Sequence, residues 1–390
     1  MRGAARAAAA AAVLAFCWAP AGVFGTSAYA AVSTYSSSEY ASFSSTAEAG
    51  VYFRECMTKR QTDVKLAIPN DSSYTYAEEV DRLFTEALRE TGNGSEGDYL
   101  RLSVKSYTVS GQSSTKTRRY SFTMDYHTTG EQEEFVEKKS AEVLDSLDLE
   151  SKNDYEKIGA VYDFVASCAD YATDLTEPTI FSAYGALANQ SVVCQGYSQL
   201  LYKLLTDAGI SCRAVLGEGV NGDAEGVDHV WNIAGIDGVY YLLDATWDSN
   251  LGGTRHFFLR GSEDFDTVKP YSHVTSTGQA DNLVFRPDYT STEFTSAYPI
   301  AKTAYAPPKT SGLGDLDDDG MVTAKDASKL LAAYADLGDN GTFTAEFIAI
   351  ADVNSNGIVN AVDASYILKY YAATAEDPSL ILEDYVKTLK

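Results

Sequence analysis

Apolar and polar residues recur with two different periods along this chain, and the two periods predict a protein that mixes helices with strands. Between residues 31 and 150, helical spacing predicts helices at TAEAGVYFRECMTKR, YAEEVDRLFTEALRETG and EQEEFVEKKSAEVLDSL. Strand-like patterns predict strands at TDVKLAIP, YLRLSVKSYTV and TRRYSFTMDYHT, the last two forming a hairpin. His127, at the end of the last strand, is interpreted as a surface residue. We therefore expect an α/β accessory domain at 31–150, without chemistry of its own.

The next part, residues 151–290, predicts an α+β domain. NDYEKIGAVYDFVASCADY predicts a helix whose apolar stripe runs up to Cys168, and a further helix begins at or just after Cys194. SCRAVLGEG, DHVWNIAGI and GVYYLLDATW predict strands. Residues 291–312 contain three prolines and little periodicity, which predicts an extended linker. Two similar segments follow at 313–375, before a C-terminal tail at 376–390.

Composition narrows the classes of partner. The chain has 390 residues, a hydrophobic content of 45% and a formal charge of −25, which are values of a soluble globular protein. Such a charge excludes nucleic acid and anionic membrane surfaces as partners, because both repel an acidic protein. It suits a solvated extracellular surface or bound cations.

The first thirty residues predict a secretory signal peptide. Arg2 and Arg6 precede an alanine-rich apolar stretch, and Ala28-Tyr29-Ala30 fits the small-residue cleavage pattern. The alternative is a membrane anchor, which the short stretch, interrupted by Pro20, disfavours. We expect cleavage after residue 30 and a secreted, extracellular protein.

The cysteines raise the question of a nucleophile. Loss of Cys17 with the signal peptide leaves four cysteines, which is too few for a disulfide scaffold: Cys56, Cys168, Cys194 and Cys212. We expect no disulfide. Cys194 could be a core residue, half of a disulfide, or a nucleophile whose thiolate is favoured by the helix start.

A turn between two strands brings a base and an acid together. The pair Asp237-Gly238 predicts a tight hairpin turn in which paired residue numbers sum to 475. His229 then lies opposite Thr246, and Asp244 lies diagonally across from His229 on the same face of the sheet. A slip of one residue would place them on opposite faces.

Cys194, His229 and Asp244 can therefore act as nucleophile, base and orienting acid. Each residue also has a structural interpretation: a buried or disulfide-bonded cysteine, a core or surface histidine, and a strand-end cap. The remaining histidines, His256 and His273, are interpreted as structural or surface residues, since their spacing does not indicate a metal site with His229.

Three segments in order, VVCQGYSQLLYKLLTDAGISCRAV, DHVWNIAGIDGVYYLLDATWD and RHFFLRGSEDF, resemble the transglutaminase-like superfamily in its bacterial secreted form. The resemblance covers about 150–275 and implies a papain-related α+β core. It also implies that Cys194 is the nucleophile, His229 the base and Asp244 the orienting acid, without a cofactor for catalysis. Thiolate attack on an amide gives a thioester, which water resolves in a cysteine peptidase or amidase and an amine resolves in a protein crosslinker. We favour the peptidase, and the alternative of another class is a non-catalytic binding component.

Two acidic twelve-residue loops lie 37 residues apart near the C-terminus, DLDDDGMVTAKD and DVNSNGIVNAVD. Both have oxygen ligands at positions 1, 3, 5, 9 and 12, a backbone carbonyl at position 7 and glycine at position 6, which is the pattern of a calcium loop. The predicted ligands are Asp315, Asp317, Asp319, Met321 (carbonyl), Thr323 and Asp326, then Asp352, Asn354, Asn356, Ile358 (carbonyl), Asn360 and Asp363. We expect two Ca²⁺ ions, with the tighter site at the first loop, which has four ligand carboxylates against two.

A helix follows each loop, DASKLLAAYA and DASYILKYYA, and this duplicated loop–helix resembles the type I dockerin over about 313–375. The resemblance implies docking to a cohesin of a cellulosome scaffold, in a setting of polysaccharide catabolism. The residues implied to contact the cohesin are Ala324, Lys325, Ala361, Val362 and Lys369. The first four differ from the Ser-Thr pairs of many dockerins, so the cohesin is left open, as are the protein or peptide substrate and the role of 31–150.

Overall fold

The computed structural model describes residues 40–150, 152–222, 225–253, 255–275, 287–306, 312–337, 341–375, 377 and 380–389. The chain divides into two compact units, Met1–Tyr305 and Ala306–Lys390. The predicted signal peptide and its Cys17 lie outside the described residues. Of the helices that the structure describes, none is long and apolar enough to cross a membrane.

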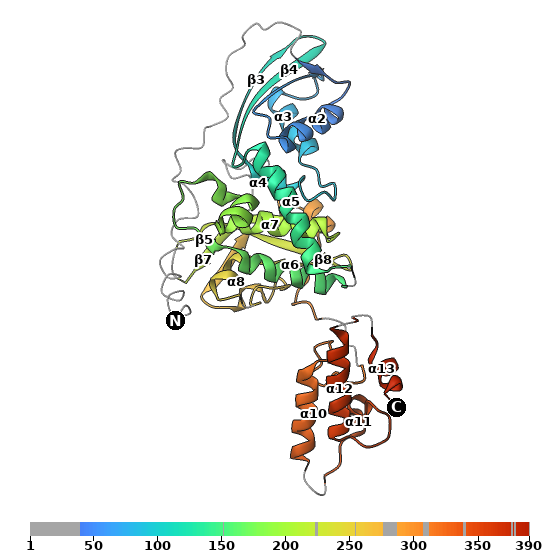
Figure 1. The fold of residues 1–390 in the computed structure, drawn as a ribbon. Helices are drawn as coiled ribbons and strands as arrows, with labels where there is room; N and C mark the ends of the chain where they lie inside the picture. The colour runs from blue at the N-terminus through green and yellow to red at the C-terminus, as the bar shows by residue number, and fades with distance from the viewer. Residues whose placement is uncertain are drawn as a thin grey trace. The chain divides into compact units, whose positions relative to one another are not determined.

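The first unit begins with a sheet of four strands in the order β1-β2-β4-β3. The strands are β1 (Ala41–Ser42), β2 (Asp63–Pro69), β3 (Val104–Ser113) and β4 (Thr117–Tyr126). Helices α2 (Thr46–Thr58) and α3 (Tyr76–Ala87) cover one face of this sheet (Figure 1). The rings of Phe53, Phe84 and Phe122 pack edge to face or tilted at the centre of its core.

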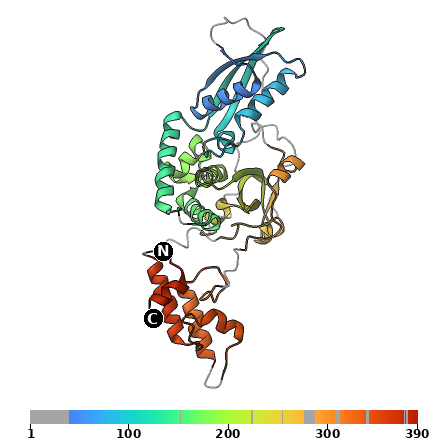
Figure 2. The ribbon, with the colours of Figure 1, turned by 90° about the vertical axis from the view of Figure 1, so that its right-hand side faces the viewer.

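Two helices of the predicted accessory domain pack against the next part of the chain. α4 (Asp98–Ser103) contacts α7 (Cys194–Asp207), and α5 (Gly130–Leu147) contacts both α7 and α6 (Asp154–Cys168) (Figure 2). The Gln199 side chain donates to the Tyr99 carbonyl at 2.9 Å, and Tyr99, Val136 and Leu204 share one buried core. The predicted boundary at 150/151 is therefore wrong, because the apolar face of α5 has its partners beyond it.

His127, which the sequence indicates to be a surface residue, is half-buried. It follows β4, and its imidazole lies 5.1 Å from the ring of Phe181. Burial lowers the pKa of His127 to about 4, so this side chain is neutral at physiological pH.

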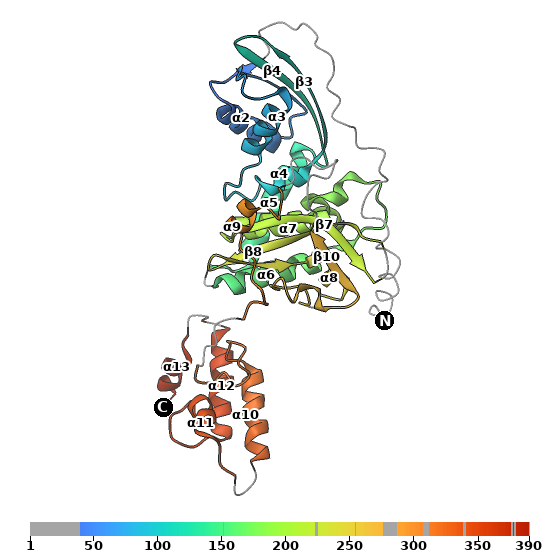
Figure 3. The ribbon, with the colours of Figure 1, turned by 180° about the vertical axis from the view of Figure 1, so that it is seen from behind.

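The first unit contains a second sheet of four strands. Its order is β10-β7-β8-β9, all antiparallel, with α6 and α7 on one face (Figure 3). The strands are β7 (Cys212–Asn221), β8 (Val227–Ile236), β9 (Val239–Leu243) and β10 (Tyr271–Thr275). Shorter elements lie around it: β5 (Asp170–Tyr171), β6 (Ser191–Val192), η1 (Pro178–Phe181), η2 (Gly185–Asn189) and η3 (Phe265–Thr267).

The β8–β9 hairpin has the predicted turn and the predicted register. Asp237 and Gly238 both have positive φ, 52° and 80°, as a tight hairpin turn requires. Pairs run from Ile236↔Val239 to Asn232↔Leu243, and every pair sums to 475. The predicted strand is too long, however, because Asp244 caps the helix α8 (Ala245–Asn250), so Thr246 and Trp247 are helical.

The predicted linker 291–312 is wrong up to Tyr305. Residues up to Tyr305 belong to the first unit, and α9 (Thr292–Ala297) buries Phe294 in its core. Ile300 forms a parallel bridge with Tyr240 of β9. Prolines and small polar residues here accompany ordered edge contacts, which the local pattern did not reveal.

The second unit contains α10 (Ala324–Asp336), α11 (Ala345–Ala351), α12 (Ala361–Thr374) and α13 (Leu382–Thr388). α10 and α12 pack on each other through Ala327 and Leu330, and through Ala364 and Ile367, which are 37 residues further on. The predicted tail 376–390 is wrong for α13, whose Leu382 and Val386 are part of this core. Helices and strands mix in the first unit, and the elements that the structure describes in the second unit are helices, so the predicted α+β class is confirmed.

Candidate functional site

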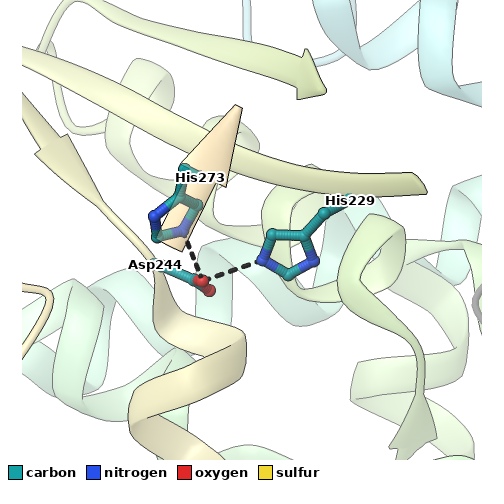
Figure 4. Close-up of side chains that lie close together, drawn as sticks. All are labelled: His229, Asp244 and His273. Carbon is teal, nitrogen blue, oxygen red and sulfur yellow. Dashed lines mark hydrogen bonds and ion pairs between the residues drawn. The ribbon is translucent and has the colours of Figure 1, made fainter. Parts of the chain in front are cut away.

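His229 and Asp244 meet beside the β8–β9 hairpin. His229 lies on β8, and Asp244 is the residue between β9 and α8. Nε2 of His229 and Oδ2 of Asp244 are 2.8 Å apart (Figure 4), and both side chains are buried. The structure thus brings together the two residues that the turn position predicts to be neighbours, although Asp244 leaves the strand to cap a helix.

The carboxylate of Asp244 is held from both sides. Oδ1 accepts hydrogen bonds from the backbone N–H groups of Thr246 and Trp247, at 2.9 and 3.1 Å, in the first turn of α8. Oδ2 faces His229 Nε2 and also His273 Nε2, at 3.1 Å. Burial acts to raise the pKa of Asp244, but the two imidazoles outweigh it and hold the pKa well below its usual range. Asp244 is therefore a fixed anion.

His273 is the site residue that the sequence interpretation missed. It lies on β10 with a side chain that is 3% exposed, and its Nδ1 is 2.8 Å from Oδ1 of Asp266. The interpretation as a structural or surface residue rested on spacing along the chain. The relevant proximity comes from β10 pairing with β7, where His273 is opposite Gly219, 54 residues earlier in the chain. No local pattern reports that pairing.

Aromatic rings enclose the two histidines. The indole of Trp247 is 4.8 Å from the His229 ring and 4.1 Å from the His273 ring, and Trp231 is 6.1 and 4.9 Å from them. Gly219 leaves room for this cluster, because a Cβ there would lie 2.9 Å from Trp247 and 3.2 Å from His229. The two indoles pack against the imidazoles and limit their movement, and they exclude water from the Asp244 carboxylate.

Cys194 is the first residue of α7, and Val193, the N-cap residue, makes no side-chain cap hydrogen bond. Cys194 is 3% exposed and belongs to the same buried cluster as Trp231 and Trp247, the two indoles beside His229. α7 is tied to β8 one turn later, where Ser198 Oγ donates to the Val230 carbonyl at 2.8 Å. The thiol therefore lies in the environment that also contains the His229–Asp244 pair.

The other cysteines are structural. None of the four cysteines in the described part of the chain forms a disulfide. Burial raises the pKa of Cys56, raises that of Cys168 to about 12, and raises that of Cys212 far above its usual value. These three remain neutral thiols at physiological pH.

Asp248, one turn along α8 from Asp244, is a buried carboxyl group that titrates near neutrality. Burial raises its pKa to about 7, although the hydroxyl of Tyr162 at 2.5 Å and the N–H groups of Phe257 and His256 oppose that shift. The ordinary pKa of an aspartate is near 4. At pH values between about 4 and about 7, the folded protein therefore holds a proton on Asp248 that the unfolded chain has released.

We expect this carboxyl to lower the free energy of unfolding as the pH rises from about 4 to about 7. Asp248→Asn cannot release a proton, so its melting temperature relative to that of the natural protein should be higher at pH 8 than at pH 5. Thermal unfolding of both proteins at the two pH values measures this. A difference in melting temperature that stays constant between pH 5 and pH 8 contradicts it.

Among the described residues, two groups of side chains are spaced closely enough to hold a metal ion. One is His229, Asp244 and His273, whose ligand-type atoms lie within 4.8 Å of one another. The hydrogen bonds of 2.8 and 3.1 Å to Asp244 account for that spacing. The other group is Asp315, Asp317 and Asp326 in the first acidic loop.

The two acidic loops have the same internal geometry. The carboxylate at position 1 accepts from the N–H groups of positions 5 and 6: Asp315 from Asp319 and Gly320 at 3.3 and 3.0 Å, and Asp352 from Asn356 and Gly357 at 3.0 and 2.7 Å. The carboxylate at position 12 accepts from the N–H of position 9, Asp326 from Thr323 and Asp363 from Asn360.

Both loops are shaped for a cation. The position-6 glycines have φ values of 86° and 79°, a conformation that other residues rarely adopt. Oδ1 of Asp317 is buried and has no hydrogen-bond partner among the described residues. A buried carboxylate oxygen without a donor is well suited to a Ca²⁺ ion, which oxygen ligands coordinate at about 2.3–2.6 Å. The predicted ligand set fits calcium.

The predicted partner-binding residues lie in the first turns of α10 and α12, except Lys369, which lies further along α12. Lys325, Ala361, Val362 and Lys369 are exposed, and Ala324 is half-buried. The structure adds residues that the sequence interpretation did not name: Leu331 and Tyr334 are exposed on α10, and Leu368 and Tyr371 are exposed on α12, again 37 residues apart. The 37-residue repeat could have identified these residues, because the same apolar side chains recur at exposed positions of both helices.

Comparisons with known proteins agree with both resemblances, the transglutaminase-like one and the dockerin one. Residues 141–245 match the family model described as the transglutaminase-like superfamily, and residues 313–371 match that of the dockerin type I domain. The kyphoscoliosis peptidases of Mus musculus and Homo sapiens are 25% and 26% identical over 126 residues, covering 29% of this chain and 19% of each relative. The chain therefore spans about a fifth of the length of these curated relatives.

A solved structure, the crystal structure of a TGase, is similar over 49% of this chain and 57% of its own, with 12% identity and a TM-score of 0.27. A likeness this low carries no argument. The transglutaminase-like match includes Cys194, His229 and Asp244 and ends before His273. The chain thus contains a transglutaminase-like core at residues 141–245 and a type I dockerin domain at residues 313–371.

Proposed function

We propose that this chain is a secreted cysteine peptidase or amidase of the transglutaminase-like superfamily, held on a cellulosome scaffold by its dockerin. The observation that carries the proposal is the 2.8 Å contact between His229 and Asp244, a carboxylate that two backbone N–H groups fix in place. Cys194 begins a helix that packs on the same sheet and shares the buried cluster of Trp231 and Trp247.

In this proposal Cys194 is the nucleophile and His229 the base. His229 donates from Nε2 to Asp244, which leaves Nδ1 to accept the thiol proton. The thiolate attacks the amide carbonyl and forms a carbon–sulfur bond. The amide carbon–nitrogen bond then breaks, and the leaving nitrogen takes the proton from the imidazolium. Water, deprotonated by His229, releases the acid from the thioester.

The start of α7 supports the charge that develops in this reaction. Its first-turn N–H groups and its dipole favour negative charge at Cys194, both on the thiolate and on the oxyanion formed by attack. Asp244 keeps His229 in one tautomer and stabilises the imidazolium form. The chemistry needs no metal ion or cofactor, and the alternative outcome, transfer to an amine, uses the same acyl-enzyme.

The dockerin supplies the location. Type I dockerin domains bind calcium, and in this chain the loop residues from Asp315 to Asp326 and from Asp352 to Asp363 would hold one Ca²⁺ ion each. Cohesin would contact Ala324, Lys325, Ala361, Val362 and Lys369, together with the exposed apolar pairs on α10 and α12. Such an assembly is extracellular, which agrees with the predicted signal peptide.

Site-resolved alkylation by iodoacetamide tests the nucleophile, with the rate at each cysteine followed by mass spectrometry. Cys56 is an internal control because it is buried to the same degree, 2% against 3% exposed. At pH 7 Cys194 should react at least about tenfold faster than Cys56, since the thiolate is the reactive form. His229→Ala should remove most of that difference, and the matched variant of an exposed histidine, His256→Ala, should leave it unchanged.

Equal rates at Cys194 and Cys56, or an unchanged rate in His229→Ala, would contradict the proposal and leave the non-catalytic alternative. Digestion of a peptide library, compared with the Cys194→Ala protein in the presence of calcium, then identifies the substrate. A labelled amine included in the same digest separates the peptidase from the crosslinker, because only a crosslinker incorporates it into the peptides.

A further inference from the structure

A second histidine–carboxylate pair lies behind the one just described, outside the residues that the family model matches. Asp266 of η3 contacts His273 of β10 twice: Oδ1 is 2.8 Å from the ring Nδ1, and Oδ2 accepts the His273 backbone N–H at 3.1 Å. Nε2 of the same ring is 3.1 Å from Oδ2 of Asp244. Figure 4 shows the rings of His273 and His229 converging on this one carboxylate.

The contacts of its two ring nitrogens with Asp266 and Asp244 explain the position of the His273 side chain. The ring stacks on Phe265 at 4.0 Å and packs against Trp247 at 4.1 Å, so its plane is fixed from both sides. Packing alone would be satisfied by any flat apolar side chain. Both ring nitrogens instead face carboxylate oxygens, and a buried nitrogen that faces an anion must donate a hydrogen bond to it.

The sheet is built to allow this contact. His273 on β10 and His229 on β8 flank the intervening strand β7 on the same face, and β7 carries glycine at both positions opposite them, Gly219 and Gly217. A Cβ on Gly219 would lie within 3.2 Å of His229. With no side chain between them, the two imidazoles can reach the same oxygen of Asp244.

We propose that His273 is a positioning residue of the active site: its Nε2–H holds Oδ2 of Asp244 in place, and Asp266 holds His273. Oδ1 of Asp244 is fixed by α8, so His273 is the group that fixes the other oxygen, the one that orients His229. In this proposal the role of His273 is indirect. It acts through Asp244 and His229 on the reactivity of Cys194, and the proposal therefore rests on the proposed function.

Two replacements of His273 separate this role from packing. In His273→Gln, the side-chain amide reaches the Nε2 position and can still donate to Asp244. In His273→Asn, the amide reaches only the Nδ1 position, toward Asp266. Both variants remove the ring, and they differ in whether the hydrogen bond to Asp244 can still form. The readout is the alkylation rate of Cys194 by iodoacetamide in the full-length protein with calcium, together with the melting temperature.

We expect His273→Asn to slow alkylation of Cys194 by about 10- to 100-fold, the effect of losing a hydrogen bond to a charged group. His273→Gln should stay within about threefold of the natural protein, because the donor is retained. A similar loss of rate in both variants, or no loss in either, overturns the proposal. Cys194 reacting no faster than Cys56 in the natural protein overturns the proposed function instead, which keeps the two failures distinct.

A variant at Asp266 provides a second test should the His273 variants fold poorly, since its side chain is 35% exposed and outside the ring cluster. Asp266→Ala releases the His273 ring and should slow alkylation by roughly three- to tenfold. The same change made in the His273→Gln protein should have a smaller effect on the rate, because that protein has no ring for Asp266 to hold. Equal effects in the two backgrounds would show that Asp266 does not act through His273.

Discussion

Asp244→Asn is expected to lower the rate of amide hydrolysis by about 10⁴-fold while leaving the fold intact. The two oxygens of Asp244 have separate tasks. Oδ1 caps α8 through the N–H groups of Thr246 and Trp247, and the asparagine carbonyl oxygen can take over that task. The amide nitrogen then stands where Oδ2 faces His229 and His273, and it presents a donor to two imidazoles that need an acceptor. His229 must then turn its other tautomer toward Cys194 or leave its position.

Asp244→Ala is the matched control for this prediction. It removes the acceptor for both imidazoles and also the helix cap, whose loss costs about 1 kcal/mol. Both variants should therefore be nearly inactive, but only the alanine variant should show a clearly lower melting temperature. Hydrolysis of a peptide found in the library digest, measured beside thermal unfolding, checks both. Near-normal hydrolysis by the asparagine variant would show that Asp244 is a structural cap and no part of the reaction.

The His229–Asp244 contact could be predicted because a single local feature determines it. Asp237 and Gly238 adopt the positive φ values of a tight turn, and the turn fixes every pair of the hairpin up to Asn232↔Leu243. The end of β9 could not be predicted in the same way. Asp244 leaves the ladder because its carboxylate caps α8, and an aspartate between apolar residues is compatible with a strand end or a helix start.

His273 shows what a single sequence leaves out. Its role depends on the pairing of β10 with β7, in which His273 lies opposite Gly219, 54 residues earlier, and on Asp266 in a short 3₁₀ turn. None of these has a periodic signal, and histidine spacing along the chain is uninformative when the contacts cross a sheet. The same limit explains α9 and α5, whose apolar residues find their partners in distant segments.

The acidic loops are the opposite case, because nearly all of their geometry is local. Each carboxylate at positions 1 and 12 accepts from N–H groups within ten residues, so a twelve-residue pattern specifies the loop. The repeat of 37 residues then specifies the pairing of α10 with α12. The sequence analysis predicted neither α11 nor α13. Leu382 and Val386 of α13 follow no repeat and complete the core from beyond it.

Removal of calcium is expected to unfold residues 313–371 in the full-length protein and to abolish cohesin binding. Asp326 and Asp363 are fully buried, and Asp315 is nearly so. Without a cation, loop one would keep three carboxylates within 4.8 Å of one another in a small domain with a modest core. The free energy of calcium binding then contributes directly to the free energy of folding of residues 313–371. Hydrogen exchange resolved by mass spectrometry, with and without chelator, should show loss of protection in α10 and α12 and little change in α7.

The two loops should differ in affinity, and the internal repeat supplies the matched variants. Loop one offers four ligand carboxylates and loop two offers two, so calorimetric titration should resolve two Ca²⁺ sites, with loop one tighter by roughly tenfold or more. Asp326→Ala should remove the tighter site and Asp363→Ala, 37 residues later, the weaker one. Cohesin binding should fall in both variants, because the helix after each loop depends on its cation. A single site, or the tighter site in loop two, would contradict the argument from carboxylate number. In the hydrogen-exchange experiment, unchanged protection of α10 and α12 in the presence of chelator would show that the apolar core alone stabilises this domain.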